Sequence, residues 1–219
     1  MTVEMDKKVD ALSQLAMNQG LFDADALDEY RHRVNEEWLP TNGGRLCAKA
    51  WTDPHFKQFL MTDGKAAAAS LGFAMPEHHA SLVVKENTET VHNLICCTLC
   101  SCTAYTIIGM PPGWYKNLEY RARAVREART VLSELGLALP EAVSLKVWDT
   151  TTDTRYMVLP MRPPGTDDWT EEQLARLVSK DSMIGAARLE PPYAATARLE
   201  TSHTATASLA GAPLTSARL

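Results

Sequence analysis

Three cysteines within six residues constrain this chain more than any other feature of its sequence. They lie in the segment Cys97-Thr98-Leu99-Cys100-Ser101-Cys102, called the claw below. Thiolates are soft anionic ligands, and several that converge on one point bind a soft or borderline transition metal. Zinc fingers and ribbons take four ligands from two separate knuckles, whereas this sequence has no second knuckle. The spacing therefore predicts a compact metal site in which the backbone amides between Cys100 and Cys102 also approach the ion.

The residues alone leave other uses of these thiols open. A zinc site could combine the three thiolates with His92, His78 or His79. The Cys-x-x-Cys unit could serve thiol–disulfide exchange, although such units normally open a helix near a βαβ pattern. The cluster could also be purely structural. Four of the five cysteines lie between residues 96 and 102, which argues against a disulfide framework, and we expect Cys47 and Cys96 to fill the core.

Composition and charge exclude some classes of protein. The chain has 219 residues, of which 45% are hydrophobic and 22% charged, as in a globular protein. Its net charge of −5 argues against a nucleic-acid partner, which usually meets a basic face. No apolar run approaches the roughly 20 residues that span a bilayer, and the polar residues 1–8 hold no signal core. We therefore expect a cytoplasmic protein with no membrane partner.

The hydrophobic pattern changes from helical to strand-like after Pro76. Apolar spacing predicts helices over residues 5–19, 26–38, 45–51, 54–60, 66–71, 118–135 and 170–178, with a turn at Asn42-Gly43-Gly44. Short β-branched or alternating runs predict strands at 82–84, 94–96, 143–148 and 156–159. The patterns favour an α+β fold in three parts. These are an N-terminal helical arm (1–75), an α/β metal-binding domain with short strands flanked by helices (76–189), and an Ala/Thr/Ser-rich tail (190–219).

The claw and the motifs around it resemble the α subunit of nitrile hydratase and its relative in thiocyanate hydrolase. The resemblance runs from about residue 9 to about residue 185. Besides the claw it rests on Glu86-Asn87-Thr88, Val91-His92-Asn93, Gly109-Met110-Pro111-Pro112-Gly113-Trp114-Tyr115-Lys116, Tyr120-Arg121-Ala122-Arg123, Arg155-Tyr156-Met157-Val158-Leu159-Pro160, Arg162-Pro163-Pro164-Gly165-Thr166 and Asp181-Ser182-Met183-Ile184-Gly185.

The resemblance implies a specific set of metal ligands. Cys97, Cys100 and Cys102 would supply sulfur, and the backbone nitrogens of Ser101 and Cys102 would supply deprotonated amides, which require a strongly polarising trivalent ion. In the family Cys100 is oxidised to a sulfinate and Cys102 to a sulfenate, both states of the ordinary thiol oxidation ladder. Cobalt members carry Thr at position 98 and iron members carry Ser, so Thr98 implies cobalt(III), with iron(III) as the alternative.

The implied reaction is hydration of a nitrile to an amide, with Cys102, Cys100 and Ser101 as the catalytic residues. The nucleophile is either water at the metal or the sulfenate oxygen of Cys102. Thiocyanate hydrolysis is the alternative activity, and a metal-carrying subunit with no turnover of its own is a third possibility.

The resemblance also implies partners. The helical arm would wrap a β-type subunit, in one chain or split over two, and an activator or metallochaperone could assist assembly. In the family, arginines of the β subunit hold the oxidised sulfurs. The sequence shows no substitute for them close to the claw, so we expect this chain alone to be inactive or poorly active.

The sequence departs from the common pattern of the family in two places. Common members read Tyr-Pro-Trp-Pro after the claw, where this chain has Thr103-Ala104-Tyr105-Thr106, which puts Tyr105 at the position of the pocket tryptophan. The family's glutamine near the active site aligns best with His78, which could instead be a surface-loop histidine. We expect Tyr105 and His78 to bind substrate in a wide, polar pocket that suits a bulky or heteroaromatic nitrile, as in the toyocamycin type of the family.

Overall fold

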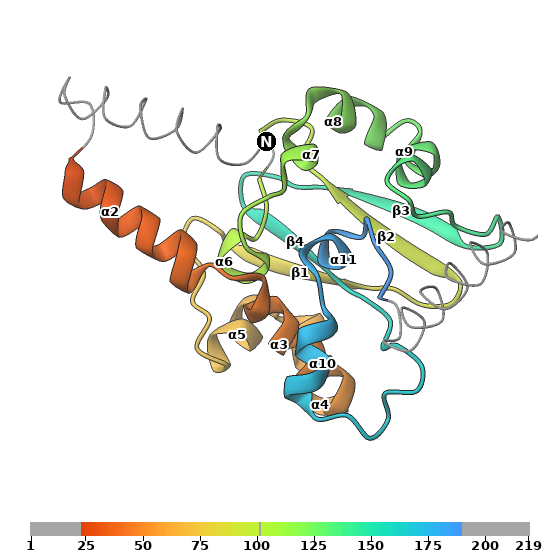
Figure 1. The fold of residues 1–219 in the computed structure, drawn as a ribbon, viewed down its shortest axis with the longest axis horizontal. Coiled ribbons are helices and arrows are strands. Elements are labelled where there is room, and N and C mark those ends of the chain that lie inside the picture. Colours follow the sequence, from red (N-terminus) through yellow and green to blue (C-terminus); the bar gives the residue numbers. More distant parts are fainter. Residues whose placement is uncertain (1–22, 101, 190–219) are drawn as a thin grey trace, which may run out of the picture.

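The computed structural model describes residues 23–100 and 102–189. The predicted helix over 5–19, Ser101 and the predicted tail over 190–219 lie outside these residues. The described chain has the predicted α+β fold (Figure 1). Its strands form two parallel pairs, β1 (Ser81–Glu86) with β4 (Thr154–Leu159) and β2 (Val91–Cys96) with β3 (Ser144–Asp149). All four predicted strands are therefore confirmed.

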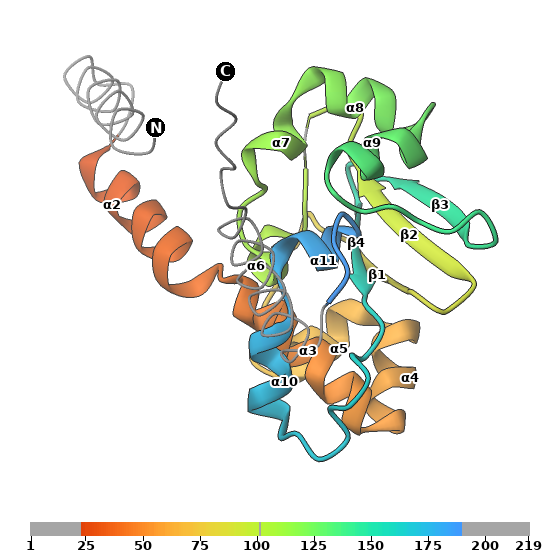
Figure 2. The same cartoon turned by 45° about the vertical axis from the view of Figure 1, so that its right-hand side comes forward.

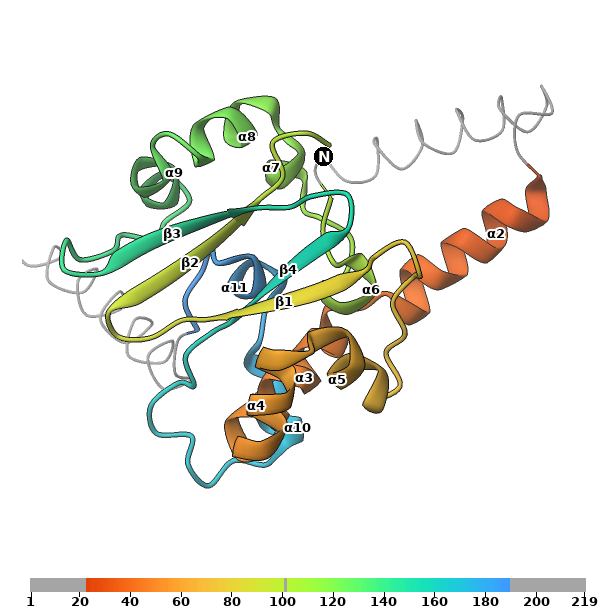
Figure 3. The same ribbon diagram turned by 180° about the vertical axis from the view of Figure 1, so that it is seen from behind.

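Helices cover the strands on several sides (Figure 3). Helices α3, α4, α5 and α10 pack together below the β1–β4 pair in Figure 1, whereas α8 and α9 lie above β2 and β3. The bounds of the helices are α2 (Ala24–His32), the π-helical η1 (Arg33–Glu37), α3 (Pro40–Thr52), α4 (Pro54–Thr62), α5 (Gly64–Ser70), α6 (Tyr105–Ile108), α7 (Gly113–Lys116), α8 (Leu118–Ala124), α9 (Ala128–Glu134), α10 (Glu171–Leu177) and α11 (Lys180–Ile184).

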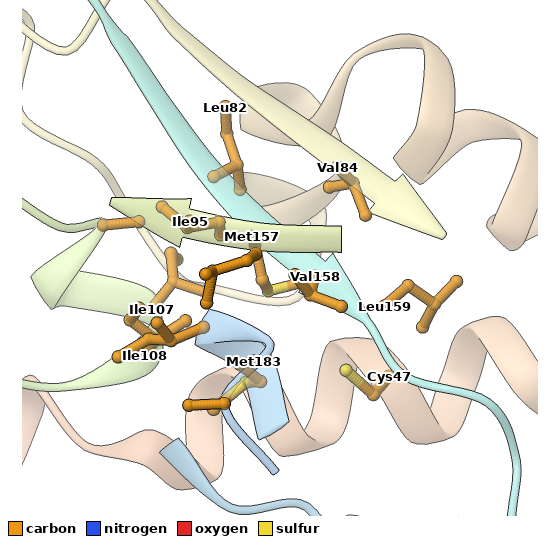
Figure 4. Packing of buried hydrophobic residues seen from close by; sticks show 14 of the residues in the cluster. Cys47, Leu82, Val84, Ile95, Ile107, Ile108, Met157, Val158, Leu159 and Met183 are labelled. Atoms are coloured by element: carbon orange, nitrogen blue, oxygen red, sulfur yellow. The ribbon is translucent and has the colours of Figure 1, made fainter. Parts of the chain in front are cut away.

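Helix α11 lies against β2 and β4, where the strands bury their apolar side chains. Figure 4 shows Met183 of α11 facing a cluster that includes Ile95, Met157 and Val158. Each of these four side chains is at most 1% exposed. At 25 cal/mol per Å² of apolar area, burying one such side chain contributes roughly 1.5–3 kcal/mol, so this cluster fixes how the two strand pairs meet.

Side-chain caps begin several helices where the sequence indicates them. Asp53 accepts hydrogen bonds from the amides of His55 and Phe56, and Pro54 fills the first position of α4. Thr170 and Gln173 form a reciprocal capping box at the start of α10. A helix with its amides satisfied in this way can start at a defined residue, which fixes the loop before it.

The predicted turn at Asn42-Gly43-Gly44 is wrong, because all three residues lie inside α3. The glycines serve packing instead of turning the chain. A Cβ on Gly44 would lie 2.6 Å from the carbonyl oxygen of Ala175 in α10, and one on Gly43 would overlap the sulfur of Met183. Only residues without a side chain let α3 approach α10 and α11 this closely.

The single helix predicted over 118–135 is also wrong, because residues 125–127 separate α8 from α9. The break lets the two pieces pack against different neighbours. Tyr120 of α8 donates its hydroxyl to the carbonyl of Ile95 at the end of β2, whereas α9 packs against β3. Arg123 joins them across the break through ion pairs with Glu127 and Glu134.

The part of the described chain that projects from the body is short. Helix α2 and η1 stand away from the rest (Figures 1 and 2), while α3, α4 and α5 pack against one another, α10 and β1. The division of the chain at residue 75 stays a prediction. None of the helices in the described ranges is long and apolar enough to cross a membrane.

Candidate metal centre

The claw begins directly after β2, at the carboxyl end of a parallel strand pair, which is a common place for ligands. Cys97 is buried, Cys100 exposed and Cys102 half-buried, and none of the three is in a disulfide. The Sγ atoms of Cys97 and Cys100 are 3.6 Å apart and those of Cys100 and Cys102 are 2.7 Å apart. All three sulfurs lie within 4.8 Å of one another. Ser101, whose backbone nitrogen is a predicted ligand, lies outside the described residues.

The thiols of Cys97 and Cys102 differ in how readily they ionise. Burial raises the pKa of Cys97, but amides of Cys100, Cys102 and Leu99 more than offset this and leave it below the ordinary value. The Cys100 amide donates to Cys97 Sγ at 3.4 Å. Burial and the neighbouring Cys100 raise the pKa of Cys102 to about 12. Cys97 therefore ionises more readily than Cys102, and a bound cation would favour ionisation of both. This soft, anionic donor set fits a transition metal.

Other residues fix the claw at both ends. The buried hydroxyl of Tyr115 donates to the carbonyl oxygen of Cys102 at 3.1 Å. Burial raises the pKa of this tyrosine, which keeps its proton available for the hydrogen bond. At the other end, Thr98 donates its amide to Asp149 Oδ1 and its hydroxyl to Asp149 Oδ2. Sequence reasoning missed Asp149, since 51 residues separate it from Thr98.

The cysteines that were expected to be core residues are buried. Cys47 and Cys96 have no exposed surface. Burial raises the pKa of both, and for Cys96 the nearby charges of Asp149 and Cys97 add to the effect and raise it to about 12. Both prefer the neutral thiol, which suits core packing and not metal binding.

A zinc site that uses His92 is contradicted by the hydrogen bonds of that ring. Nε2 lies 2.7 Å from the carbonyl oxygen of Gly185, so it carries the proton and donates. Nδ1 then accepts from Asn87 Nδ2 at 3.3 Å. Among the described residues, no histidine nitrogen joins the three sulfurs in the cluster. His92 is thus part of the packing between β2 and the loop after α11.

Tyr105 begins α6, three residues after the claw, and lies in a row of aromatic rings. Its ring centroid is 4.7 Å from that of Trp38 and 5.3 Å from that of His79. His78 is exposed and meets His79 with a centroid distance of 4.4 Å, whereas His79 is only 1% exposed. Burial, followed by the charges of Arg155, His78 and Lys65, lowers the pKa of His79 to about 4. Tyr105 therefore packs beside a neutral histidine that the sequence offered only as a possible zinc ligand.

The expectation that no residue of this chain replaces the partner's arginines at the claw stays a prediction. Burial raises the pKa of both Cys102 and Tyr105, and the positive charge of Arg155 on β4, which is 5% exposed, offsets part of that rise. Its Nη1 donates to the carbonyl oxygens of Thr151 at 2.5 Å and Thr152 at 3.2 Å. Arg155 Nε and His79 Nδ1 are buried without a hydrogen-bond partner among the described residues. These two buried nitrogens therefore remain available for hydrogen bonds.

Comparison with known proteins decides the family. The profile described as "Nitrile hydratase, alpha chain" matches residues 3–187. The chain belongs to the nitrile hydratase α-chain family. It is 44% identical over 184 residues to the low-molecular weight cobalt-containing nitrile hydratase subunit alpha of Rhodococcus rhodochrous, which covers 84% of this chain and 88% of that protein.

Two further family relatives differ in metal and in activity. Thiocyanate hydrolase subunit gamma of Thiobacillus thioparus is 40% identical over 195 residues, or 83% of this chain and 78% of that protein. A solved double mutant of the Fe-type nitrile hydratase of Comamonas testosteroni Ni1 has a TM-score of 0.78 and 51% identity. That alignment covers 100% of this chain and 98% of the other. The two enzyme types of the predicted alternatives therefore share this fold.

Proposed function

We propose that this chain is the metal-bearing catalytic subunit of a nitrile hydratase, which hydrates a nitrile to the corresponding amide. The observation that carries the proposal is the convergence of three cysteine sulfurs after β2, within the sequence pattern of the nitrile hydratase α chain. Cys97, Cys100 and Cys102 would bind through sulfur, and Ser101 and Cys102 through backbone nitrogen. Cys100, Ser101 and Cys102 are the proposed catalytic residues.

The proposed metal is low-spin cobalt(III). Its support is the cobalt-containing relative from Rhodococcus rhodochrous, together with Thr98. The Fe-type relative from Comamonas testosteroni favours the second candidate, iron(III). When bound, either trivalent ion would act as a Lewis acid that polarises the nitrile or activates water. Cys100 as a sulfinate and Cys102 as a sulfenate would make the sulfur ligands more polar and able to accept hydrogen bonds.

The chain's own residues would shape the surroundings of the reacting group. Tyr115 holds the carbonyl of Cys102, so the last ligand keeps its place. The positive charge of Arg155 acts on Cys102 and would favour negative charge on an oxidised sulfur. Tyr105 would line the pocket for the remainder of the nitrile, with His79 behind it and the exposed His78 at the rim. A tyrosine hydroxyl can donate or accept a hydrogen bond to a heteroaromatic substrate.

We further propose that a β-type subunit, in one chain or two, completes the site. Cys100 and Leu99 are exposed on the described surface of the isolated chain, with 82% of Leu99 accessible. A pocket that binds a small substrate buries most of the substrate's surface, so we propose that the partner covers this exposed end of the claw. An activator or metallochaperone is a further proposed partner during loading of the metal.

Elemental analysis combined with peptide mass spectrometry tests the proposal on the purified complex. We expect about one cobalt for each claw, with oxidation confined to Cys100 and Cys102, and turnover of a nitrile to its amide. About one iron for each claw, with the same cysteine oxidation, would identify iron(III) and not cobalt(III) as the metal. Stoichiometric zinc with three unmodified thiols would contradict the catalytic role.

Thiocyanate hydrolase is the second candidate function, favoured by the 40% identity to its gamma subunit. Thiocyanate also presents a triple-bonded carbon–nitrogen group, so the claw would treat both substrates alike. Turnover of thiocyanate without turnover of any nitrile would establish this activity in place of the first.

A further inference from the structure

We propose that Asp149 is a positioning residue that clamps the first half of the claw, and that Thr98 acts through this clamp and not on the metal. The inference rests on the proposed function, since it assumes that the claw binds a metal. It assigns roles to two side chains that supply no ligand atom.

The position of Asp149 follows from the pairing of β2 with β3. Cys96, the last residue of β2, lies opposite Asp149, the last residue of β3. The Thr150 amide then donates to the Cys96 carbonyl at 2.9 Å, so backbone pairing continues one step beyond the strands. From this fixed point the Asp149 side chain reaches past Cys96 to the claw. Its carboxylate is therefore carried by the sheet and not by a loose loop.

Both oxygens of Asp149 bind the same residue. The Thr98 amide donates to Oδ1 at 2.9 Å, and the Thr98 hydroxyl donates to Oδ2 at 2.6 Å. Hydrogen bonds to a charged group are the shorter and stronger kind. Two of them in parallel fix the rotation of the Cys97–Thr98 peptide as well as its position. The direction in which the chain leaves Cys97 is thereby set before the next ligand, Cys100.

The clamp completes a pair of contacts that hold the claw at both ends. Tyr115 secures the far end at Cys102, and Asp149 secures the near end at Thr98. Leu99 and Cys100 between them are exposed. A site whose ligands are held in place before binding loses less entropy when the ion arrives.

Charge alone gives no reason for a carboxylate at this position. Asp149 adds negative charge next to the thiols, where it acts against ionisation of Cys96. Its two hydrogen bonds to Thr98 are the favourable interactions that offset this repulsion. A carboxylate is the acceptor that can bind an amide and a hydroxyl together, one with each oxygen.

The clamp changes what residue 98 is expected to do. The Thr98 hydroxyl is donated to Asp149, so it is not a group that selects the ion directly. A serine at this position carries the same hydroxyl and would make the same bond. We therefore infer that replacement of Thr98 by Ser leaves the identity of the metal unchanged.

The experiment compares variants of the complete complex expressed with both cobalt and iron supplied. Asp149→Ala removes the clamp, Thr98→Val removes only the hydroxyl bond, and Thr98→Ser retains it. Glu141→Ala, which removes an exposed carboxylate shortly before β3, is the control for loss of charge. The readouts are metal content for each claw, oxidation of Cys100 and Cys102 by mass spectrometry, and the sulfur-to-metal absorption band.

We expect metal content and cysteine oxidation to fall about fivefold in Asp149→Ala, as expected for loss of hydrogen bonds to a charged group partly open to water, and less in Thr98→Val. Thr98→Ser and Glu141→Ala should match the wild type in amount and identity of metal. If circular dichroism shows that Asp149→Ala does not fold, the Thr98→Val variant tests the inference instead. It removes only one hydroxyl from an exposed residue.

Two results would overturn the inference. The first is an Asp149→Ala complex with the metal content, cysteine oxidation and absorption band of the wild type. If Asp149→Ala is unfolded, the same result for the Thr98→Val complex would overturn the inference. The second is a switch of metal in Thr98→Ser. A wild-type complex without cobalt or iron would instead contradict the proposed function, which keeps the two failures distinct.

Discussion

Two buried basic side chains stand beside Tyr105, and burial treats them differently. His79 loses its charge, since burial and the charge of Arg155 lower its pKa to about 4. Arg155 remains charged, because guanidinium does not deprotonate in proteins. Burial therefore keeps the imidazole of His79 uncharged, whereas the charge of the Arg155 guanidinium acts on the groups around it. This pair gives the wall next to the claw one fixed positive charge and one neutral ring.

The neutral state of His79 predicts a dependence of stability on pH. At neutral pH the histidine is uncharged in both the folded and the unfolded chain. As the pH falls from about 6.5 to about 4, the unfolded chain binds the proton first, so the folded state loses stability. The loss amounts to at most about 3 kcal/mol.

Urea unfolding of wild type and His79→Leu at pH 7.5 and pH 5 measures this effect. The loss between the two pH values should be smaller in the variant, while His78→Gln, at an exposed position, should follow the wild type. Equal losses in all three proteins would contradict a buried neutral His79.

Tyr105 leads to a prediction about substrates. A pocket lined by Tyr and not Trp should favour a bulky cyano-heterocycle over a small aliphatic nitrile in kcat/KM. We expect Tyr105→Trp to lower that ratio about tenfold, or about 1.4 kcal/mol of transition-state binding. Tyr105→Phe separates size from hydrogen bonding, since it removes only the hydroxyl. A tenfold preference of the wild type for the small nitrile would show that the pocket is narrow.

A residue's role could be predicted from the sequence when its partners lie nearby in the chain. The three ligands of the claw and the cap at Asp53 carry their signal within a few residues. Asp149 and Arg155 carry no such local signal. Asp149 binds Thr98, and the charge of Arg155 acts on Cys102, only once β2, β3 and β4 are assembled. Their residue types were visible, but the sequence could not show which of many charged side chains the strands would place there.

Among the elements, α3 shows how a local pattern can mislead. Asn-Gly-Gly favours a turn in isolation, yet here it forms helix because α10 and α11 need close approach. Tertiary packing thus outweighed local propensity. The four strands were predictable because their side chains alternate or run apolar over a few residues. The break between α8 and α9 was not, because Val125 to Glu127 contain neither Gly nor Pro.

Close helix packing predicts opposite results for two glycine substitutions. Gly44→Ala would push a methyl group to within 2.6 Å of the Ala175 carbonyl oxygen, so we expect about 1–3 kcal/mol of destabilisation from overpacking. Gly113→Ala in α7 meets nothing within 4 Å and should be neutral or slightly stabilising. The midpoint of denaturant unfolding measures both. A Gly44→Ala protein as stable as the wild type would mean that α3 and α10 are not held this tightly.

At the scale of the whole molecule, the described chain presents an incomplete site. The claw lies at the surface. Helix α2 projects from the body (Figure 2), and its Tyr30 side chain is 46% exposed. An internal arginine supplies one positive charge, but nothing on the described surface covers Leu99 and Cys100. This shape suits a subunit that is completed by another chain.

Assembly is therefore predicted to control activity. The isolated chain loaded with metal should turn over nitriles poorly, and addition of the β-type subunit should raise the rate by orders of magnitude. Size-exclusion chromatography of the mixture, with activity measured across the fractions, tests this. Full activity in a stable monomer would show that Arg155 and its neighbours suffice.

The pairing of Cys96 with Asp149 also sets an order of events during synthesis. Thr98 leaves the ribosome 51 residues ahead of the carboxylate that holds it, an interval of about 3–10 s at ordinary elongation rates. Throughout that interval the nascent thiols have neither the sheet nor its clamp to arrange them. Protection from stray oxidants and premature zinc must then come from outside the chain, and the intended ion should be inserted after β3 has been synthesised.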